Sequence, residues 1–148
     1  MPNCAKRTRV LGIDFGERRI GLAVSDPLAL IAQPLPTLLR RRGKRAPVAR
    51  VAQIALDQGV RCIVLGLPLS PQGEETEWTG KVRAFGDMLA QRTDLPVRYQ
   101  DERMTSARAE RAVRGLGLSR RERERKERVD AAAAVLILQA FLDGEANG

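Results

Sequence analysis

Residues 9–25 read RVLGIDFGERRIGLAVS, and this stretch predicts how the fold begins. The apolar residues of 9–15 favour a buried strand that carries Asp14 near its end. A short polar turn follows, and residues 19–25 form a second apolar run. Two such runs joined by a tight turn predict a β-hairpin with a carboxylate at the end of its first strand.

Strand-like and helix-like patterns alternate after the hairpin. Further strands are predicted from extended or apolar runs at residues 31–39, 61–67 and 95–100. Helices are predicted from apolar spacing at residues 47–58, 75–92, 105–114 and 129–142. Pro34 and Pro36 favour a sheet edge because proline lacks a backbone N–H. This order predicts an α/β fold with a central five-stranded mixed sheet and helices on both faces. We expect one domain over residues 1–148, with short flexible termini.

The last part of the chain holds two segments of different character. Residues 120–128 alternate charge signs, which fits either a solvated helix with internal ion pairs or a mobile basic segment beside nucleic acid. Residues 129–142 are apolar on nearly all sides and predict a buried helix. Asp130 is expected at the start of that helix, where an acid favours the helix dipole and could also approach Asp14.

Composition narrows the possible chemistry. The 148 residues carry a net charge of +8, which favours polyanions, most often nucleic acid, as partners. The chain has no histidine, which excludes imidazole bases and histidine-ligated zinc. With only Cys4 and Cys62, we expect no disulfide framework and a cytoplasmic location. The polar N-terminus and the short apolar runs predict neither a secretory signal nor a membrane span.

Three carboxylates lie where strands end or a helix begins. Asp14 ends the first strand, Glu102 follows the strand at residues 95–100, and Asp130 precedes the last apolar run. If they converge, they can bind divalent metal ions that assist the hydrolysis of a phosphodiester. Asp101 competes with Glu102 for the inward position, and strand alternation does not decide between them. Taken singly, each acid also fits a structural role as turn former, helix cap or dipole partner.

Basic and polar residues near these acids predict a nucleic-acid interface, because arginine binds phosphate with two parallel hydrogen bonds. The residues expected to contact the nucleic-acid backbone are Arg18, Arg19, Arg41, Arg42, Lys44, Arg45, Ser70 and Arg103. A purely structural loop is the alternative for the segment around Ser70. Trp78 shares a helical stripe with Phe85 and Leu89, so we expect it in the core rather than on a base-stacking surface.

Several strings occur together in a specific order and spacing. They are Gly12-Ile13-Asp14-Phe15-Gly16 with Arg19-Ile20-Gly21-Leu22-Ala23-Val24-Ser25-Asp26, then Gly66-Leu67-Pro68, then Asp101-Glu102-Arg103, and last Asp130 with Ala133-Ala134 and Ile137-Leu138-Gln139. With these strings the chain closely resembles the YqgF family, also called RuvX, of small bacterial ribonuclease H-like proteins. The resemblance covers about residues 9–142.

The resemblance implies a nuclease that helps to mature the 5′ end of precursor 16S ribosomal RNA. It also implies the older proposal that such proteins resolve four-way DNA junctions, by analogy with RuvC resolvases. The family's acidic site falls on Asp14, Glu102 and Asp130, which selects the second of the two neighbouring acids. Many members have Lys in place of Arg18, and Asn-Met-Asp in place of Ser70-Pro71-Gln72. The difference at Ser70-Pro71-Gln72 bears on whether this loop takes part in substrate choice, and it leaves the expected metal site unchanged.

The combined prediction is a metal-dependent nuclease that uses Mg²⁺ or Mn²⁺ in a two-metal mechanism. The expected partners are precursor rRNA or branched DNA and the ribosome or a pre-ribosomal particle, with no membrane; the protein would be a monomer or homodimer. A Holliday junction resolvase is the main alternative, and an inactive nucleic-acid-binding factor is a further one. Sugar kinases and actin-like ATPases share this fold, but they enclose ATP between two such domains and this chain supplies one.

Overall fold

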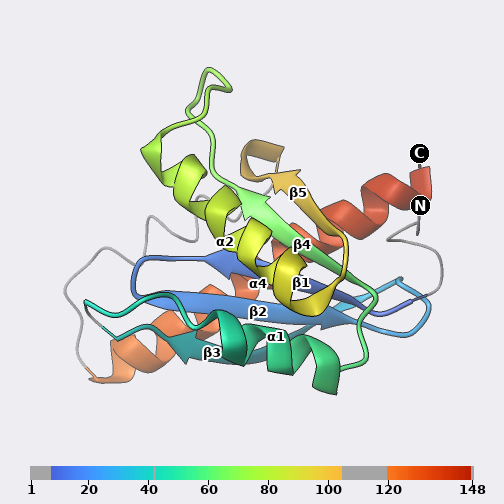
Figure 1. Cartoon of the computed structure of the whole chain (residues 1–148), viewed down its shortest axis with the longest axis horizontal. Coiled ribbons are helices and arrows are strands. Elements are labelled where there is room, and N and C mark those ends of the chain that lie inside the picture. Colours follow the sequence, from blue (N-terminus) through green and yellow to red (C-terminus); the bar gives the residue numbers. More distant parts are fainter. Residues whose placement is uncertain (1–7, 42, 105–119, 148) are drawn as a thin grey trace.

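The structure is a computed structural model that describes residues 8–41, 43–104 and 120–147. Its elements in chain order are β1 (Val10–Phe15), β2 (Arg19–Ser25), β3 (Ala32–Leu39), α1 (Val48–Asp57), β4 (Cys62–Leu67), α2 (Glu77–Thr93), β5 (Val97–Asp101), the short 3-10 helix η1 (Glu102–Met104) and α4 (Arg120–Asn147) (Figure 1). The five predicted strands and the first two predicted helices are confirmed, with small shifts at their ends.

The strands form one mixed sheet in the order β3-β2-β1-β4-β5, which confirms the predicted sheet. β1 pairs antiparallel with β2, as the hairpin pattern predicts, and parallel with β4. β4 in turn pairs parallel with β5. β3 lies at an edge of the sheet, as its two prolines indicate. The carboxyl ends of β1, β4 and β5 therefore meet at one end of the sheet.

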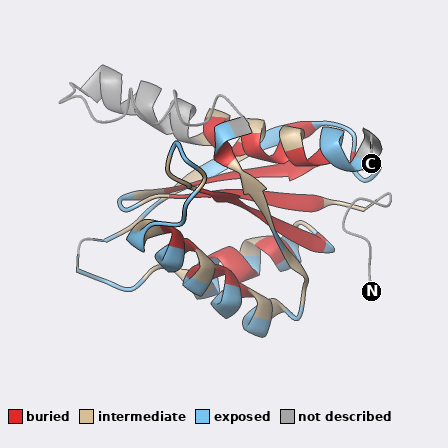
Figure 2. Ribbon diagram, turned by 90° about the horizontal axis from the view of Figure 1, so that it is seen from above, coloured by how far each residue is buried: buried red, intermediate tan, exposed pale blue. Residues whose placement is uncertain are grey.

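Helices cover both faces of the sheet, as predicted (Figure 2). One apolar cluster joins the sheet to α1 and α2, and a second joins it to α4. Because side chains alternate along a strand, Leu11, Ile13 and Phe15 of β1 belong to the first cluster and Val10 belongs to the second. We call the two surfaces of the sheet the α1/α2 face and the α4 face.

Helix α4 begins before the buried helix predicted from the apolar residues, and it includes the charged segment 120–128, for which a solvated helix was one of the two predictions. It runs without interruption from Arg120 to Asn147, whereas the expected helix spans only residues 129–142. The alternating charges of residues 120–128 suit a helix, because opposite charges three or four residues apart attract each other. Asp130 therefore lies inside α4 and not at its start, so the expected role at the helix dipole is wrong. The helix expected at residues 105–114 lies outside the described residues.

Cys62 starts β4 and is buried, as expected of a small apolar residue. It is disulfide-bonded, which corrects the expectation of no disulfide. That expectation rested on the number and spacing of the cysteines, and neither property limits which side chains meet in a fold. Within the part of the chain that the structure describes, no helix has both the length and the apolar character needed to cross a membrane.

Candidate active site and nucleic-acid interface

Asp14 lies near the carboxyl end of β1, the middle strand of the sheet, and its side chain is fully buried. Alternation along β1 places it on the α4 face, in line with Val10 and Gly12. A Cβ at Gly12 would lie only 2.6 Å from the Cβ of Leu138 in α4. The glycine thus lets α4 pack closely against the strand that carries Asp14.

Glu102 follows β5 directly, and only 2% of it is exposed. β1 and β4 pair in parallel up to Ile13 and Leu65, and Asp14 and Gly66 are the next residues of the two strands. A Cβ at Gly66 would overlap Oε1 of Glu102 and would lie 2.6 Å from Cδ1 of Ile137 in α4. The space left by the missing side chain of Gly66 therefore holds the Glu102 carboxylate. Both acids lie on the α4 face at the same end of the sheet, on either side of one glycine.

The two neighbouring acids after β5 have different surroundings. The carboxylate of Asp101 accepts hydrogen bonds from the backbone N–H of Arg103 at 2.9 Å and from its Nη2 at 2.7 Å. The hydrogen bond from Arg103 to Asp101 raises the pKa of Arg103, so its guanidinium stays charged. Asp101 is partly exposed and Glu102 is buried. The fold thus turns Glu102 inward and keeps Asp101 at the surface with a cation.

Asp130 lies on α4, one helical turn before Ala134. The carbonyl oxygen of Ala134 would lie 3.3 Å from a Cβ at Gly12, so this part of α4 crosses β1. The Asp130 side chain is outside the described residues, and its approach to the other two acids stays a prediction. Among the side chains that are described, no group of three or more acids, histidines or cysteines is placed to hold a metal ion.

The donor set nevertheless suits a hard divalent cation. Asp14 and Glu102 offer carboxylate oxygens, which are the ligands that Mg²⁺ prefers in proteins. Both acids interact with other groups of the protein, so neither is isolated in the apolar interior. Two ionised carboxylates that are buried close together repel each other, and a bound cation would offset that repulsion. The residues present therefore fit a divalent metal ion.

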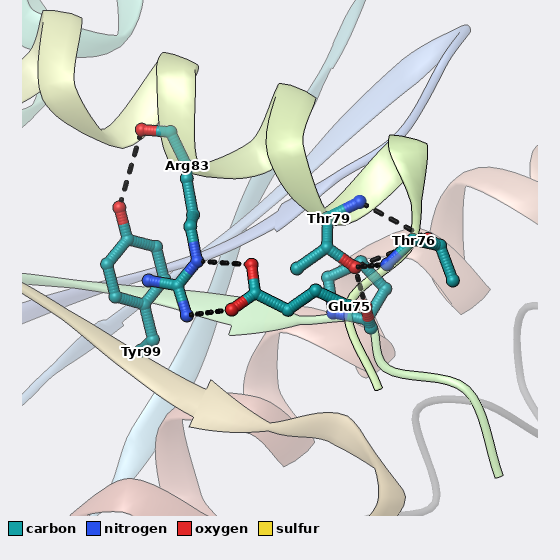
Figure 3. Close-up of polar contacts among 6 residues, drawn as sticks. Glu75, Thr76, Thr79, Arg83 and Tyr99 are labelled. Carbon is teal, nitrogen blue, oxygen red and sulfur yellow. Dashed lines mark hydrogen bonds and ion pairs between the residues drawn. The ribbon is translucent and has the colours of Figure 1, made fainter. Parts of the chain in front are cut away.

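The loop after β4 is tied to α2 at both of its ends (Figure 3). The Thr79 hydroxyl donates a hydrogen bond to the carbonyl of Pro68, and Thr79 also forms a reciprocal cap with Thr76 at the start of α2. At the other end, the Arg83 guanidinium binds the Glu75 carboxylate through two hydrogen bonds of 2.7 and 3.0 Å. These contacts hold the loop in place above the carboxyl end of β4.

Ser70 stabilises this loop from within. Its hydroxyl accepts a hydrogen bond from the backbone N–H of Glu74, and its carbonyl accepts one from Gly73. A Cβ at Gly73 would lie 2.8 Å from Nη1 of Arg103, so Arg103 packs beneath the loop. The predicted contact residues Ser70 and Arg103 therefore belong to one group.

The remaining predicted contact residues form a second group on the other side of the β1 end. Arg18, in the hairpin turn, accepts a backbone hydrogen bond of 2.7 Å from Arg40, which follows β3. The hairpin turn and the basic loop after β3 thus lie side by side. Exposed side chains in this group are those of Arg18, Arg41, Lys44 and Arg45, while Arg19 is partly buried. Arg42 lies outside the described residues.

Comparisons with known proteins identify the family of the chain. The family model RuvX, described as Holliday junction resolvase, matches residues 8–144. A protein of Chloroflexus aggregans is 43% identical over 138 residues, which cover 93% of this chain and 95% of that protein. A protein of Koribacter versatilis is 47% identical over 135 residues, which cover 91% of this chain and 86% of that protein. Both carry the name "Putative pre-16S rRNA nuclease".

Solved structures support the fold. Thermus thermophilus RuvC in complex with Holliday junction substrate matches with a TM-score of 0.56 and 16% identity, over 94% of this chain and 96% of that one. RuvC has a ribonuclease H-like fold, so the expected fold is confirmed. The match of the family model to residues 8–144, with relatives that are 43% and 47% identical, establishes that the chain belongs to the RuvX family.

Proposed function

We propose that this protein is a metal-dependent nuclease that hydrolyses phosphodiester bonds during 5′-end maturation of precursor 16S rRNA. The observation that carries the proposal is the pair of buried acids, Asp14 and Glu102, on either side of Gly66 in a basic protein. The names of the relatives support rRNA as the substrate. The proposed setting is the cytoplasm, with one ribonuclease H-like domain, as monomer or homodimer, acting on a pre-ribosomal particle.

Asp14, Glu102 and Asp130 would hold the metal ions, Mg²⁺ or Mn²⁺. When bound in a pair, such ions offset the negative charge that develops on the attacking and leaving oxygens of a phosphodiester. The chain's own part is to hold the carboxylates in fixed positions before substrate arrives, because preorganised charges need no reorganisation during the reaction. Packing of α4 on Gly12 and the space at Gly66 provide that fixed arrangement.

The basic residues on both sides of the acids would bind the substrate backbone. Arg103 is oriented by Asp101 and stays charged, so it can place a phosphate near the end of β5. The exposed cations of the hairpin turn and of the loop after β3 would bind the strand on the other side of β1. Substrate would therefore cross the carboxyl end of the sheet, over Asp14 and Glu102.

Holliday junction resolution is the second candidate, because the family description names that activity. An inactive binding factor is disfavoured by the acids themselves, because buried carboxylates weaken phosphate binding unless a cation neutralises them.

The test is a cleavage assay with Mg²⁺ or Mn²⁺ on two end-labelled substrates, a 5′-extended 16S precursor RNA and a four-way DNA junction. Asp14→Asn and Glu102→Gln should each lower cleavage at least about 100-fold, the cost of removing one group that stabilises transition-state charge. Asp87→Asn, the same change at an exposed position of α2, is the matched control and should cleave normally.

Removal of the metal with a chelator should stop cleavage, and added metal should restore it. Cutting of the RNA at a defined position supports the maturation nuclease, whereas symmetric cutting of the junction alone favours the resolvase. Cleavage by Asp14→Asn at the wild-type rate would contradict the proposed site.

A further inference from the structure

A cavity of about 300 Å³ opens on the α1/α2 face, opposite the two buried acids. Residues that line it include Phe15, Glu17, Arg40, Trp78, Lys81 and Met88. Its volume is at the lower end of the range of small-molecule pockets, so it suits a ligand of about the size of one nucleotide. The proposed active site does not use it.

The cavity has an aromatic wall that neighbouring rings hold in place. The ring of Trp78 stacks on that of Phe15, with centroids 5.5 Å apart and planes inclined by 15°. Phe15 stacks in turn on Phe85, at 4.3 Å between centroids. Phe15 and Phe85 are buried, whereas Trp78 is partly exposed. A partly exposed ring backed by buried rings is a preformed surface on which a base can stack.

Two cations stand beside this wall. The Arg40 guanidinium lies 4.8 Å from the centroid of Phe15 and donates a hydrogen bond from Nη1 to the carbonyl of Gly16. Its Nε is buried and has no acceptor among the described residues. The Lys81 ammonium lies 5.9 Å from the Trp78 ring. Glu17 adds one negative charge, so the cavity is cationic. The Arg40 guanidinium has further N–H groups on its two Nη atoms, which can donate hydrogen bonds to a phosphate oxygen.

The cavity lies next to the proposed active site along the chain but on the other face of the sheet. Phe15 follows Asp14 directly, and successive side chains of a strand point to opposite faces. A nucleic-acid strand that crosses the carboxyl end of β1 over Asp14 would thus reach the mouth of the cavity. The residues that follow β1 and β3, which supply Glu17 and Arg40, already belong to the proposed interface.

We propose that this cavity binds one unpaired nucleotide of the substrate strand, with its base on Trp78 and its phosphate between Arg40 and Lys81. The proposal rests on the proposed nuclease function and adds a substrate requirement to it. A base in a duplex is stacked and paired and does not fit the cavity, so the substrate must carry a single-stranded nucleotide beside the cut. Glu17 would face the edge of the base, because a carboxylate repels phosphate.

Trp78 is the only tryptophan of the chain, so its fluorescence reports on the cavity alone. The full-length protein is titrated in the presence of a chelator, which separates binding from cleavage. The probes are a single-stranded tetranucleotide, the same sequence in a duplex, and a nucleoside monophosphate. We expect saturable quenching by the tetranucleotide, weaker binding of the monophosphate and little quenching by the duplex.

Variants test which residues are responsible. Lys81→Gln should weaken binding of the tetranucleotide about tenfold or more, as expected for loss of a hydrogen bond between charged groups. Arg92→Gln removes the same charge from an exposed position of the same helix, outside the cavity, and should change affinity less than about threefold, the effect of net charge alone. Trp78→Leu, followed by anisotropy of a labelled tetranucleotide, should weaken binding roughly 5- to 100-fold, whereas Trp78→Phe should keep most of it.

The proposal is overturned if the tetranucleotide leaves Trp78 fluorescence unchanged, or if Lys81→Gln and Arg92→Gln weaken binding equally. Tighter binding of the monophosphate than of the tetranucleotide would also overturn it, because the cavity would then be a site for free nucleotides. These outcomes are independent of catalysis. If Asp14→Asn abolishes cleavage and Trp78 does not respond, only the cavity proposal fails. If Trp78 responds and the wild type cleaves neither substrate, only the proposed activity fails.

Discussion

The two faces of the sheet are made from alternate residues of the same strands, yet they differ in what they contain. On the α4 face, glycines at positions 12 and 66 leave space for Leu138 and Ile137 of α4 and for the carboxylate of Glu102. Two buried carboxylates lie there. On the α1/α2 face, Phe15 and Phe85 stack within a larger apolar cluster. One face thus provides room for acids, and the other provides most of the large apolar contacts.

The residues that contribute most to stability and the acids of the proposed site therefore lie on opposite faces of the same sheet. Buried charges destabilise a fold unless they are compensated, so a protein that keeps acids on one face needs compensating apolar burial elsewhere. Successive side chains of a β-strand point to opposite faces, so two neighbouring residues can serve these two purposes. Asp14 lies on the α4 face and Phe15 on the α1/α2 face. Substitutions on the α1/α2 face should therefore mainly lower the free energy of unfolding, and substitutions near the acids on the α4 face should mainly lower cleavage.

The largest effect on folding is expected from the α1/α2 face. Phe85→Ala should lower the free energy of unfolding by about 3–5 kcal/mol, because it leaves a cavity in a packed core. Urea unfolding followed by circular dichroism measures the loss. Met88→Ala, on the same helix and 45% exposed, should change it by less than about 0.5 kcal/mol. Phe85 also backs the rings of Phe15 and Trp78 at the cavity, so cleavage is measured in Leu89→Ala, which truncates a buried residue of the same helix outside the cavity. Below its melting temperature the Leu89 variant should still cleave, because the acids lie on the opposite face. Loss of cleavage in the folded Leu89 variant would contradict the comparison.

A smaller change on the α4 face should affect activity more than stability. In Gly66→Ala the added Cβ would displace the Glu102 carboxylate and press on Ile137. We expect cleavage to fall about 100-fold, as for a misplacement of about 1 Å in a catalytic group, and the free energy of unfolding to fall by about 1–3 kcal/mol. The measurements are the cleavage rate and the melting temperature of the same preparation.

Gly80→Ala is the matched control for this substitution. A Cβ at Gly80 would meet no atom within 4 Å, and the residue lies within α2. Alanine there should stabilise the protein by about 0.5–1 kcal/mol through its higher helix propensity and leave cleavage unchanged. Equal activity of the two alanine variants would show that Gly66 does not provide the space for Glu102.

The smallest effect on stability is expected from a substitution in the loop between β2 and β3, which borders the α4 face. The backbone N–H of Ile31, with those of Leu30 and Leu28, holds the pKa of Asp26 below its ordinary value. A lowered pKa means that this carboxylate stabilises the fold above the unfolded-state pKa, and that the contribution is lost as pH falls through the folded-state pKa. Asp26→Asn should therefore lower the melting temperature at pH 7, and it should lower the melting temperature much less at pH 2.

Because Asp26 is partly exposed to solvent, we expect the loss at pH 7 to be below about 1 kcal/mol. Melting curves of the wild type and the variant across this pH range measure the difference. An identical difference at both pH values would mean that the charge of Asp26 is not what holds the loop.

Local patterns in the sequence predicted most of the sheet, because the strands are continuous apolar runs separated by polar turns. The start of α4 was left open, since alternating charges suit both a helix and a mobile segment, although Ser119 with Glu122 has the sequence pattern of a capping box. The choice between Asp101 and Glu102 was also open to reasoning from strand alternation. It depends on Arg103, which holds one acid outside, and on Gly66, which makes room for the other inside.

The aromatic cavity was missed for a similar reason. It joins the end of β1, the residue after β3 and one side of α2, and no pattern within any one segment indicates that the three meet. Phe85 and Leu89 are buried, as the helical stripe predicts, but Trp78 at the start of the stripe is only partly buried. For the α4 face, the sequence did contain a signal. A glycine within a buried strand often marks a place where another segment approaches closely. The assignment of Asp14, Glu102 and Asp130 as metal ligands remains a prediction.

The two edges of the sheet have unequal consequences for self-association. β3 carries Pro34 and Pro36, which lack the N–H groups that an added strand would need. β5 contains no proline, and within the described part of the chain no further strand pairs with it. Aggregation by strand addition should therefore start at β5, and a solubility-improving substitution is best placed there and not on the opposite edge.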